Sequence, residues 1–127
     1  MNKSLDSDID LLLRILDHCD RIKSCIQRFG DDFQVYLQDL DYQDVIKMNI
    51  FQIGESVNSL SDEIKEELSG IPWHEIYGMR NIIAHGYVKI KEERIWQTIQ
   101  TDIPELDKQI TEFLENSGIK NDGEWEK

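Results

Sequence analysis

Cysteine is scarce in this sequence, whose 127 residues include only Cys19 and Cys25. Both fall in one predicted helix, six residues apart, and a rotation of about 100° per residue places them on different sides of it. They therefore cannot form a disulfide with each other. A metal site is also excluded, because no further cysteine is present and His18 is the only imidazole nearby. Two free thiols are typical of a protein in a reducing cytoplasm.

Long hydrophobic runs are also absent. A typical run, Ile9–Leu13, is short and contains an aspartate, whereas a membrane-spanning helix needs roughly 18 apolar residues in succession. The first residues turn acidic at once, without the apolar stretch of a secretory signal. We therefore expect no membrane association and a cytoplasmic location.

Positive charge is scarce as well. The chain has 14 Lys and Arg residues against 26 Asp and Glu residues, which gives a net charge of −12 and a pI near 4.5. Such a balance argues against a polyanionic partner, since phosphate binding usually relies on Lys and Arg. Residues 73–91 do not share this acidic balance, because they include Arg80, Lys89 and Lys91 and a single acidic residue, Glu75. The chain is acidic, but this segment is not.

Apolar residues recur at three- and four-residue intervals over most of the chain, which is the pattern of amphipathic helices. Asp41 is the expected N-terminal cap of the third helix, and Ser61 is that of the fourth. Pro72 should open the fifth helix, and Pro104 should kink the last one. The predicted helices cover residues 6–29, a short segment within 31–40, 41–60, a short segment from 61 to near 70, 73–84 and 92–116.

The only alternating run, residues 87–91, has no partner strand. The sequence therefore predicts an all-α fold, an up-and-down helical bundle with four main helices and one or two short ones. A chain of 127 residues suits one compact domain. We assign this domain to residues 1–118 and interpret residues 119–127 as a polar C-terminal tail.

The segment Gly78–Val88, with the sequence GMRNIIAHGYV, concentrates arginine, asparagine, histidine and tyrosine around a predicted helix end. Arg80 and His85 are five positions apart, so on an unbroken helix their directions differ by about 140°. They can converge if the helix ends or bends near Gly86, or if a second copy of the chain brings its own pair alongside. An arginine near a helix C-terminus also commonly interacts with the terminal carbonyls, so the pair by itself does not decide between chemistry and structure.

The pattern of Arg80, four residues, His85, one residue and Tyr87 resembles the signature of the HepT-like toxins of the HEPN group. Three further segments resemble the family's sequence in the family's order. They are IGESVNSLS (Ile53–Ser61), IPWHEIYGMRN (Ile71–Asn81) and RIWQTIQTDIPEL (Arg94–Leu106). The resemblance extends from Asp6 to Leu114, and the combination is far more specific than the spacing of Arg80 and His85 alone.

The resemblance implies a HEPN-like domain that forms a homodimer and acts as a metal-independent endoribonuclease without a cofactor, with the two Arg/His motifs in a cleft at the dimer interface. General chemistry agrees, because RNA supplies its own nucleophile, the 2′-hydroxyl. Histidine, with a reference pKa of about 6.5, can accept or donate a proton at neutral pH, and arginine presents a planar cationic fork to phosphate. We therefore assign general acid–base catalysis to His85 and transition-state stabilisation to Arg80, with a 2′,3′-cyclic phosphate and a 5′-hydroxyl as products.

By the same resemblance, the chain is the toxin of a type VII-like toxin–antitoxin pair. An MntA-like nucleotidyltransferase antitoxin attaches AMP to Tyr87, and this bulky anion beside His85 would block the cleft and repel RNA phosphate. The alternative for Tyr87 is a half-buried packing role. Asn81 and Lys89 are candidate substrate-binding or orienting residues, although Asn81 is equally compatible with an ordinary surface amide. The expected substrate is tRNA or mRNA.

A second hypothesis belongs to another class of protein. The chain can instead be a catalytically silent HEPN helical module that binds a nucleotide or the partner protein. The acidic composition favours this hypothesis slightly. The intact set of Arg80, His85 and Tyr87 favours the ribonuclease more.

Overall fold

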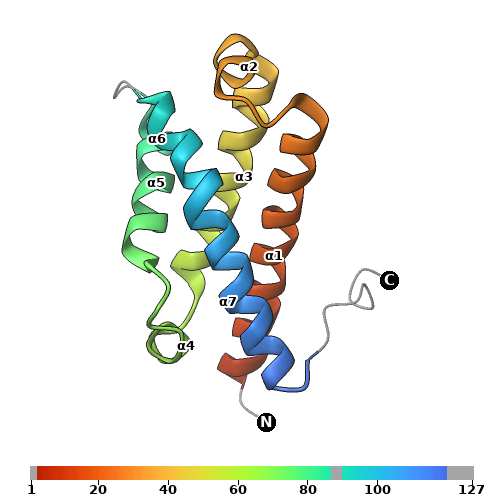
Figure 1. Ribbon diagram of the computed structural model, residues 1–127. Helices are drawn as coiled ribbons and strands as arrows, with labels where there is room; N and C mark the ends of the chain where they lie inside the picture. The colour runs from red at the N-terminus through yellow and green to blue at the C-terminus, as the bar shows by residue number, and fades with distance from the viewer. Residues whose placement is uncertain (1–2, 87–89, 120–127) are drawn as a thin grey trace.

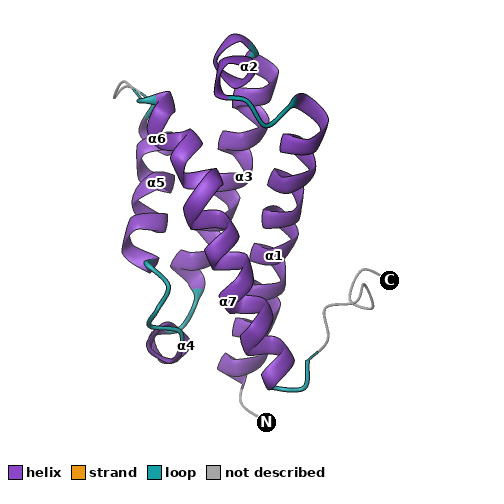
Figure 2. Ribbon diagram, in the orientation of Figure 1, coloured by secondary structure: helices purple, strands orange, loops and turns teal. Residues whose placement is uncertain are grey.

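The computed structural model describes residues 3–86 and 90–119 as a bundle of helices (Figures 1 and 2). Within those residues no strand is present, which confirms the predicted all-α class. The bundle has four long helical segments, which are α1, α3, α5 and the continuous unit α6–η1–α7, and two short helices, α2 and α4. The elements are α1 (Lys3–Phe29), α2 (Phe33–Gln38), α3 (Leu40–Ser59), α4 (Asp62–Glu67), α5 (Trp73–His85), α6 (Glu92–Gln97), η1 (Thr98–Asp102) and α7 (Ile103–Asn116).

Helix α3 is the centre of the bundle, as its apolar residues predict. It packs against α1 on one side and α5 on the other, while α7 packs against α1. Ile46, Ile50 and Ile53 of α3 are fully or almost fully buried, together with residues such as Leu12 of α1 and Ile110 of α7. Burying a side chain of this size contributes roughly 1.5–3 kcal/mol to stability. The apolar stripes of the long helices therefore account for the bundle.

Aromatic rings close the end of the bundle at which α2 lies. The rings of Phe29 and Tyr42 stack with centroids 4.9 Å apart, and Tyr36 meets Tyr42 edge-on at 5.2 Å and Trp96 at 5.4 Å. Tyr42 donates a hydrogen bond from its hydroxyl to the carbonyl oxygen of Gly30, at 2.9 Å. These contacts fix the short helix α2 over the ends of α1 and α3.

Two members of the acidic segment 31–44 are helix caps. The carboxylate of Asp32 accepts hydrogen bonds from the backbone N–H groups of Gln34 and Val35, at the start of α2. Asp39 accepts a hydrogen bond from the N–H of Tyr42 and caps α3. The prediction that Asp41 caps this helix is therefore wrong. Helix α3 begins at residue 40, earlier than expected, which moves Asp41 into its first turn. A cap of this kind contributes about 1 kcal/mol.

The irregularity near Pro104 is a π-helical turn rather than a simple kink. Residues Thr98–Asp102 form η1, and the N–H of Ile103 donates to the carbonyl oxygen of Thr98, five residues earlier. A proline has no N–H to donate, and its ring clashes with the carbonyl four residues before it, here that of Gln100. The widened turn relieves this clash, so the predicted single helix 92–116 is divided in three.

The remaining helix ends lie near their predicted positions. Ser61 caps α4 as expected, since its Oγ accepts a hydrogen bond from the N–H of Ile64 at 3.2 Å. Pro72 is the residue directly before α5. Over residues 3–86 and 90–119, no helix combines the length and the apolar character needed to cross a membrane.

Candidate functional site

Arg80 lies at a point of close approach between α5 and α3. A Cβ atom added to Gly54 of α3 would lie 2.2 Å from the Cβ of Arg80, far inside van der Waals contact. Only glycine therefore permits this approach of the two helices. The sequence places Gly54 one turn after Ile50, in the second half of α3. The close contact sets the point from which the Arg80 side chain extends.

The guanidinium of Arg80 is held by polar groups on two helices. Its Nε donates a hydrogen bond to Oε1 of Glu55 on α3, at 2.7 Å, and forms an ion pair with it. Its Nη1 donates to Oδ1 of Asn81, the next residue on α5, at 3.0 Å. Asn81, predicted to bind or orient, thus contacts the predicted catalytic arginine directly.

Two aromatic rings complete the surroundings of Arg80. The guanidinium carbon lies 5.0 Å from the centroid of the Phe51 ring on α3 and 5.8 Å from that of Tyr77 on α5. Contacts of a cation with aromatic faces at these distances are favourable by about 0.5–1 kcal/mol at an exposed site. They restrict the plane of the guanidinium, while the hydrogen bonds restrict its rotation.

One edge of the guanidinium stays available. Within the described part of the chain, the Nη2 group of Arg80 makes no hydrogen bond, and 24% of the side chain is exposed. Arginine carries five N–H donors in a fixed fork. The donors that make no hydrogen bond within the described residues can bind an anion such as a phosphate.

His85 is the last residue of α5 and is exposed. The helix is unbroken from Arg80 to His85 and ends at Gly86, whose φ of 61° is in the left-handed region that terminates helices. Because the bend considered for this segment does not occur before His85, the two side chains leave the helix about 140° apart.

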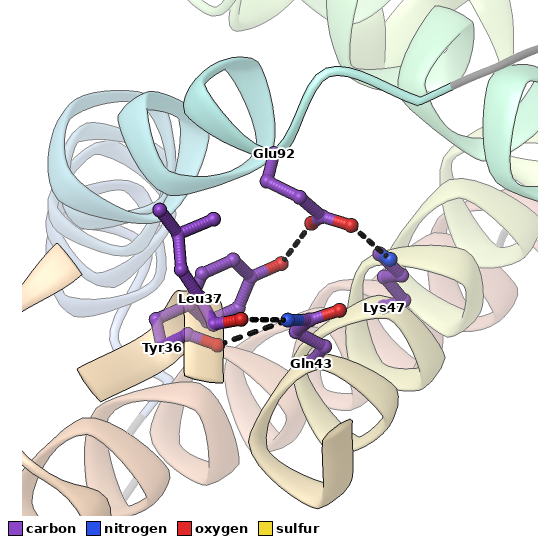
Figure 3. A network of polar contacts seen from close by, with 5 residues as sticks. All are labelled: Tyr36, Leu37, Gln43, Lys47 and Glu92. Atoms are coloured by element: carbon purple, nitrogen blue, oxygen red, sulfur yellow. Dashed lines mark hydrogen bonds and ion pairs between the residues drawn. The ribbon is translucent and has the colours of Figure 1, made fainter. Parts of the chain in front are cut away.

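Two predicted site residues, Tyr87 and Lys89, lie outside the described residues. The structure resumes its description at residue 90, and α6 begins at Glu92. Glu92 accepts a hydrogen bond from the Tyr36 hydroxyl at 2.7 Å and forms an ion pair with Lys47, also at 2.7 Å (Figure 3). The start of α6 is therefore anchored to α2 and α3.

Two cavities in the described part of the chain are lined by neither Arg80 nor His85. A groove of about 560 Å³ lies between α1 and α7, with Ile22, Ile26 and Ile103 among its lining residues. A polar pocket of about 220 Å³ lies between α5 and the π-helical turn, lined in part by Arg94 and Asp102. Burial and the neighbouring Glu75 raise the pKa of Asp102, and the charge of Arg94 lowers it.

Sequence reasoning did not find the α3 side of the site. Phe51, Gly54 and Glu55 occupy one turn of α3 and all contact Arg80, which is 25 positions from Glu55. The only signal was indirect, because Gly54 and Glu55 fall in the segment IGESVNSLS that resembles the family. Nothing in the pattern of the chain told which residue of α5 would face this turn.

Comparisons with known proteins point to one family. The sequence model of the family described as Ribonuclease HepT-like matches residues 15–113. A protein of Caldanaerobacter subterraneus subsp. tengcongensis, provisionally named an RNase, is 35% identical over 104 residues, which are 82% of this chain and 91% of the relative. One of Methanocaldococcus jannaschii, with the same provisional name, is 26% identical over 64% of this chain and 83% of its own length.

A third relative, from Thermococcus cleftensis, is provisionally named ribonuclease HepT. It is 30% identical over 74 residues, which are 58% of this chain and 67% of the relative. No solved structure gives a significant match. The family match extends from the middle of α1 to the last turns of α7 and so includes both sides of the Arg80 site. On this evidence the chain belongs to the HepT-like ribonuclease family.

Proposed function

We propose that this protein is a metal-independent endoribonuclease toxin in which Arg80 and His85 are the catalytic residues. The observation that carries the proposal is the fixed guanidinium of Arg80, which Glu55 and Asn81 hold while its Nη2 group makes no hydrogen bond to the described residues. A cation fixed in advance stabilises the charge that develops on a phosphoryl group without reorganising during the reaction. Membership of the HepT-like family supports RNA as the substrate, with tRNA and mRNA as the candidates.

The proposed reaction is an internal transfer at phosphorus. One His85 accepts the proton of the 2′-hydroxyl as O2′ forms a bond to phosphorus, and the bond from phosphorus to O5′ breaks. A second group donates a proton to the departing O5′, which leaves a 2′,3′-cyclic phosphate and a 5′-hydroxyl. Arg80 stabilises the non-bridging oxygens in the transition state. His85 of a second copy can act as the proton donor, so a dimer divides acid and base between its two histidines.

An exposed apolar face on α3 supports a homodimer. Val45 and Met48 are 41% and 59% exposed and lie three positions apart. Met48 is three positions before Phe51 and seven before Glu55, so helical spacing places it on the side of α3 that carries the Arg80 site. Burying exposed apolar side chains of this size against a second copy of the chain is favourable, because it removes them from water. A symmetric contact over this face would bring the two Arg80 sites near one another.

The proposed regulator is an MntA-like nucleotidyltransferase antitoxin that attaches AMP to Tyr87. Tyr87 is the second residue after His85 in the sequence. A nucleotide attached there adds bulk and negative charge beside the proposed catalytic histidine, which opposes RNA binding. The intact mass of the chain co-produced with its antitoxin tests this step, and an unmodified Tyr87 in an inactive complex would mean silencing by masking alone.

The first experiment compares cleavage of total cellular RNA, in the presence of a chelator, by the wild type, Arg80→Ala and His85→Ala. We expect the wild type to cut, and each variant to lose at least 100-fold of the rate while staying folded and dimeric. End-group analysis should find 2′,3′-cyclic phosphates. Cleavage that persists in either variant would remove that residue from the mechanism.

A second candidate function is a catalytically silent module that binds a nucleotide or the partner protein. The observation that favours it is the net charge of −12, which opposes RNA binding at long range. Wild-type protein that is folded, unmodified at Tyr87 and unable to cut RNA would support this candidate. Its binding to a nucleotide or to the partner would then be measured by calorimetry.

A further inference from the structure

One turn of α3 is arranged around the side chain of Arg80. Phe51, Gly54 and Glu55 have the spacing i, i+3 and i+4, which places them on one face of a helix. The ring of Phe51 contacts the guanidinium, and Gly54 permits the close approach of α5. Glu55 accepts a hydrogen bond from the Nε–H of Arg80. Every part of Arg80 that faces α3 therefore meets one of these residues.

We propose that Glu55 is a positioning residue that fixes the Arg80 guanidinium for catalysis. This inference rests on the proposed ribonuclease function. The hydrogen bond from Nε to Oε1, at 2.7 Å, sets the rotation of the guanidinium about its last side-chain bonds. The Phe51 ring sets its plane, and Asn81 holds Nη1 on the opposite side. Glu55 thereby holds Nε, and Nη2 makes no hydrogen bond to the described residues.

Stability alone is a weak explanation for this ion pair. The side chain of Glu55 is 44% exposed and that of Arg80 is 24% exposed. Ion pairs between exposed side chains typically contribute only about 0–1 kcal/mol to folding. Removing the carboxylate should therefore leave the fold intact, which makes its effect on the reaction measurable.

The contribution of Glu55 is geometric rather than electrostatic. A carboxylate beside Arg80 partly offsets the positive charge that attracts a phosphate. It can promote the reaction only by holding the guanidinium in one orientation, and a misplacement of about 1 Å at a reacting centre can cost about 100-fold in rate. Glutamine at this position keeps an oxygen acceptor and loses the charge. Alanine loses both, so the two substitutions separate geometry from charge.

The experiment measures kcat and KM of the full-length chain on a fluorescent single-stranded oligoribonucleotide, for the wild type, Glu55→Ala and Glu55→Gln. We expect Glu55→Ala to lower kcat by about 10- to 100-fold with KM within about twofold. Glu55→Gln should restore kcat to within about threefold of the wild type, with a KM equal or lower because the repulsion of phosphate is gone.

Asp17→Ala is the matched control. Asp17 accepts from Nε of Arg21 at 3.0 Å, in an exposed ion pair within α1, so the variant removes the same type of contact elsewhere. It should leave kcat and KM unchanged. Wild-type kcat in Glu55→Ala, a higher kcat in that variant, or an equal loss in Glu55→Ala and Glu55→Gln would each overturn the positioning role.

A second readout separates this inference from the proposed function. The Arg80 Nε–H resonance, assigned by its loss in Arg80→Ala, should exchange with water at least several-fold faster in Glu55→Ala than in the wild type or Glu55→Gln. If the wild type cuts no RNA, the proposed function fails and the catalytic role of Glu55 fails with it, even where slow exchange shows that Glu55 holds Arg80. If the wild type cuts and exchange is equally fast in all three proteins, only the inference about Glu55 fails.

Discussion

Two glycines on neighbouring helices, Gly54 and Gly78, differ in what surrounds them. Gly54 of α3 faces the side chain of Arg80, whereas a Cβ atom on Gly78 of α5 would meet nothing within 4 Å. Both lie inside helices, where glycine is less favourable than alanine by roughly 0.5–1 kcal/mol. The same substitution should therefore have opposite effects at the two positions.

Gly54→Ala should destabilise the protein by about 1–3 kcal/mol, because the new methyl group forces α5 away from α3. It should also lower RNA cleavage, since the displaced segment carries Arg80. Chemical denaturation of the variant and the wild type measures the first effect. Gly78→Ala is the control, and we expect it to raise stability by up to about 1 kcal/mol. Equal stability of the two variants would show that the approach of the helices at Gly54 is not tight.

At the scale of the elements, the start of α6 depends on a polar contact with α2 and α3. Tyr36 is fully buried, and its hydroxyl donates to Glu92, which also pairs with Lys47 (Figure 3). Burial and the hydrogen bond to Glu92 raise the pKa of Tyr36. The hydroxyl therefore stays protonated and remains a donor throughout the physiological range.

Tyr36→Phe should lower the free energy of unfolding by about 1–2 kcal/mol at pH 7, because Glu92 loses a hydrogen-bond donor at a half-buried site. Tyr77→Phe is the matched control, since within the described residues the Tyr77 hydroxyl makes no hydrogen bond, and it should change stability little. Urea denaturation of both variants provides the measurement. Similar losses in the two variants would argue against the Glu92 contact.

The contribution of the Tyr36–Glu92 hydrogen bond to stability should depend on pH, because the pKa of Tyr36 is raised in the folded state. In the unfolded chain a tyrosine ionises near pH 10, whereas the raised pKa keeps Tyr36 neutral in the folded state. Its contribution to stability is therefore complete below about pH 10 and is lost as the pH rises further, toward the folded pKa. The wild type should lose stability more steeply than Tyr36→Phe between about pH 9.5 and 11.

At the scale of the whole molecule, acidic charge dominates. A net charge of −12 on 127 residues destabilises the compact state through self-repulsion. Salt screens this repulsion, with a Debye length of about 30 Å at 0.01 M and about 10 Å at 0.1 M. The melting temperature at pH 7 should therefore rise between about 10 and 150 mM NaCl.

The control for this salt effect is the double variant Glu66→Lys, Glu67→Lys. Both residues are exposed on α4, and each exchange adds two positive charges, so the net charge changes from −12 to −8. The rise of the melting temperature with salt should be smaller in this variant, as differential scanning calorimetry can measure. An equal rise would point to specific ion binding instead of general repulsion.

Periodicity and short-range signals were enough to predict most of the fold. The spacing of apolar residues predicted the long helices, because a helix repeats within a few residues and its buried face can be recognised without knowing what covers it. Ser61 as a cap was predicted for the same reason, since a cap acts on the N–H group three residues later. The prediction of Asp41 as the cap of α3 was wrong because Asp39, two residues earlier, is an equally acceptable cap, and local signals do not fix at which of two such residues a helix begins.

The chain itself determined the neighbours of Arg80 along α5, Asn81 and His85, and the family resemblance gave their expected roles. Only the tertiary structure decided that Phe51, Gly54 and Glu55 of α3 surround Arg80, and that α5 is unbroken as far as His85. The physical reason is that a helix face is a local property, whereas the register of two packed helices depends on the fit of side chains far apart in the sequence. Gly54 permits this register because it has no Cβ atom. The sequence shows the glycine but not that Arg80 is the residue that packs against it.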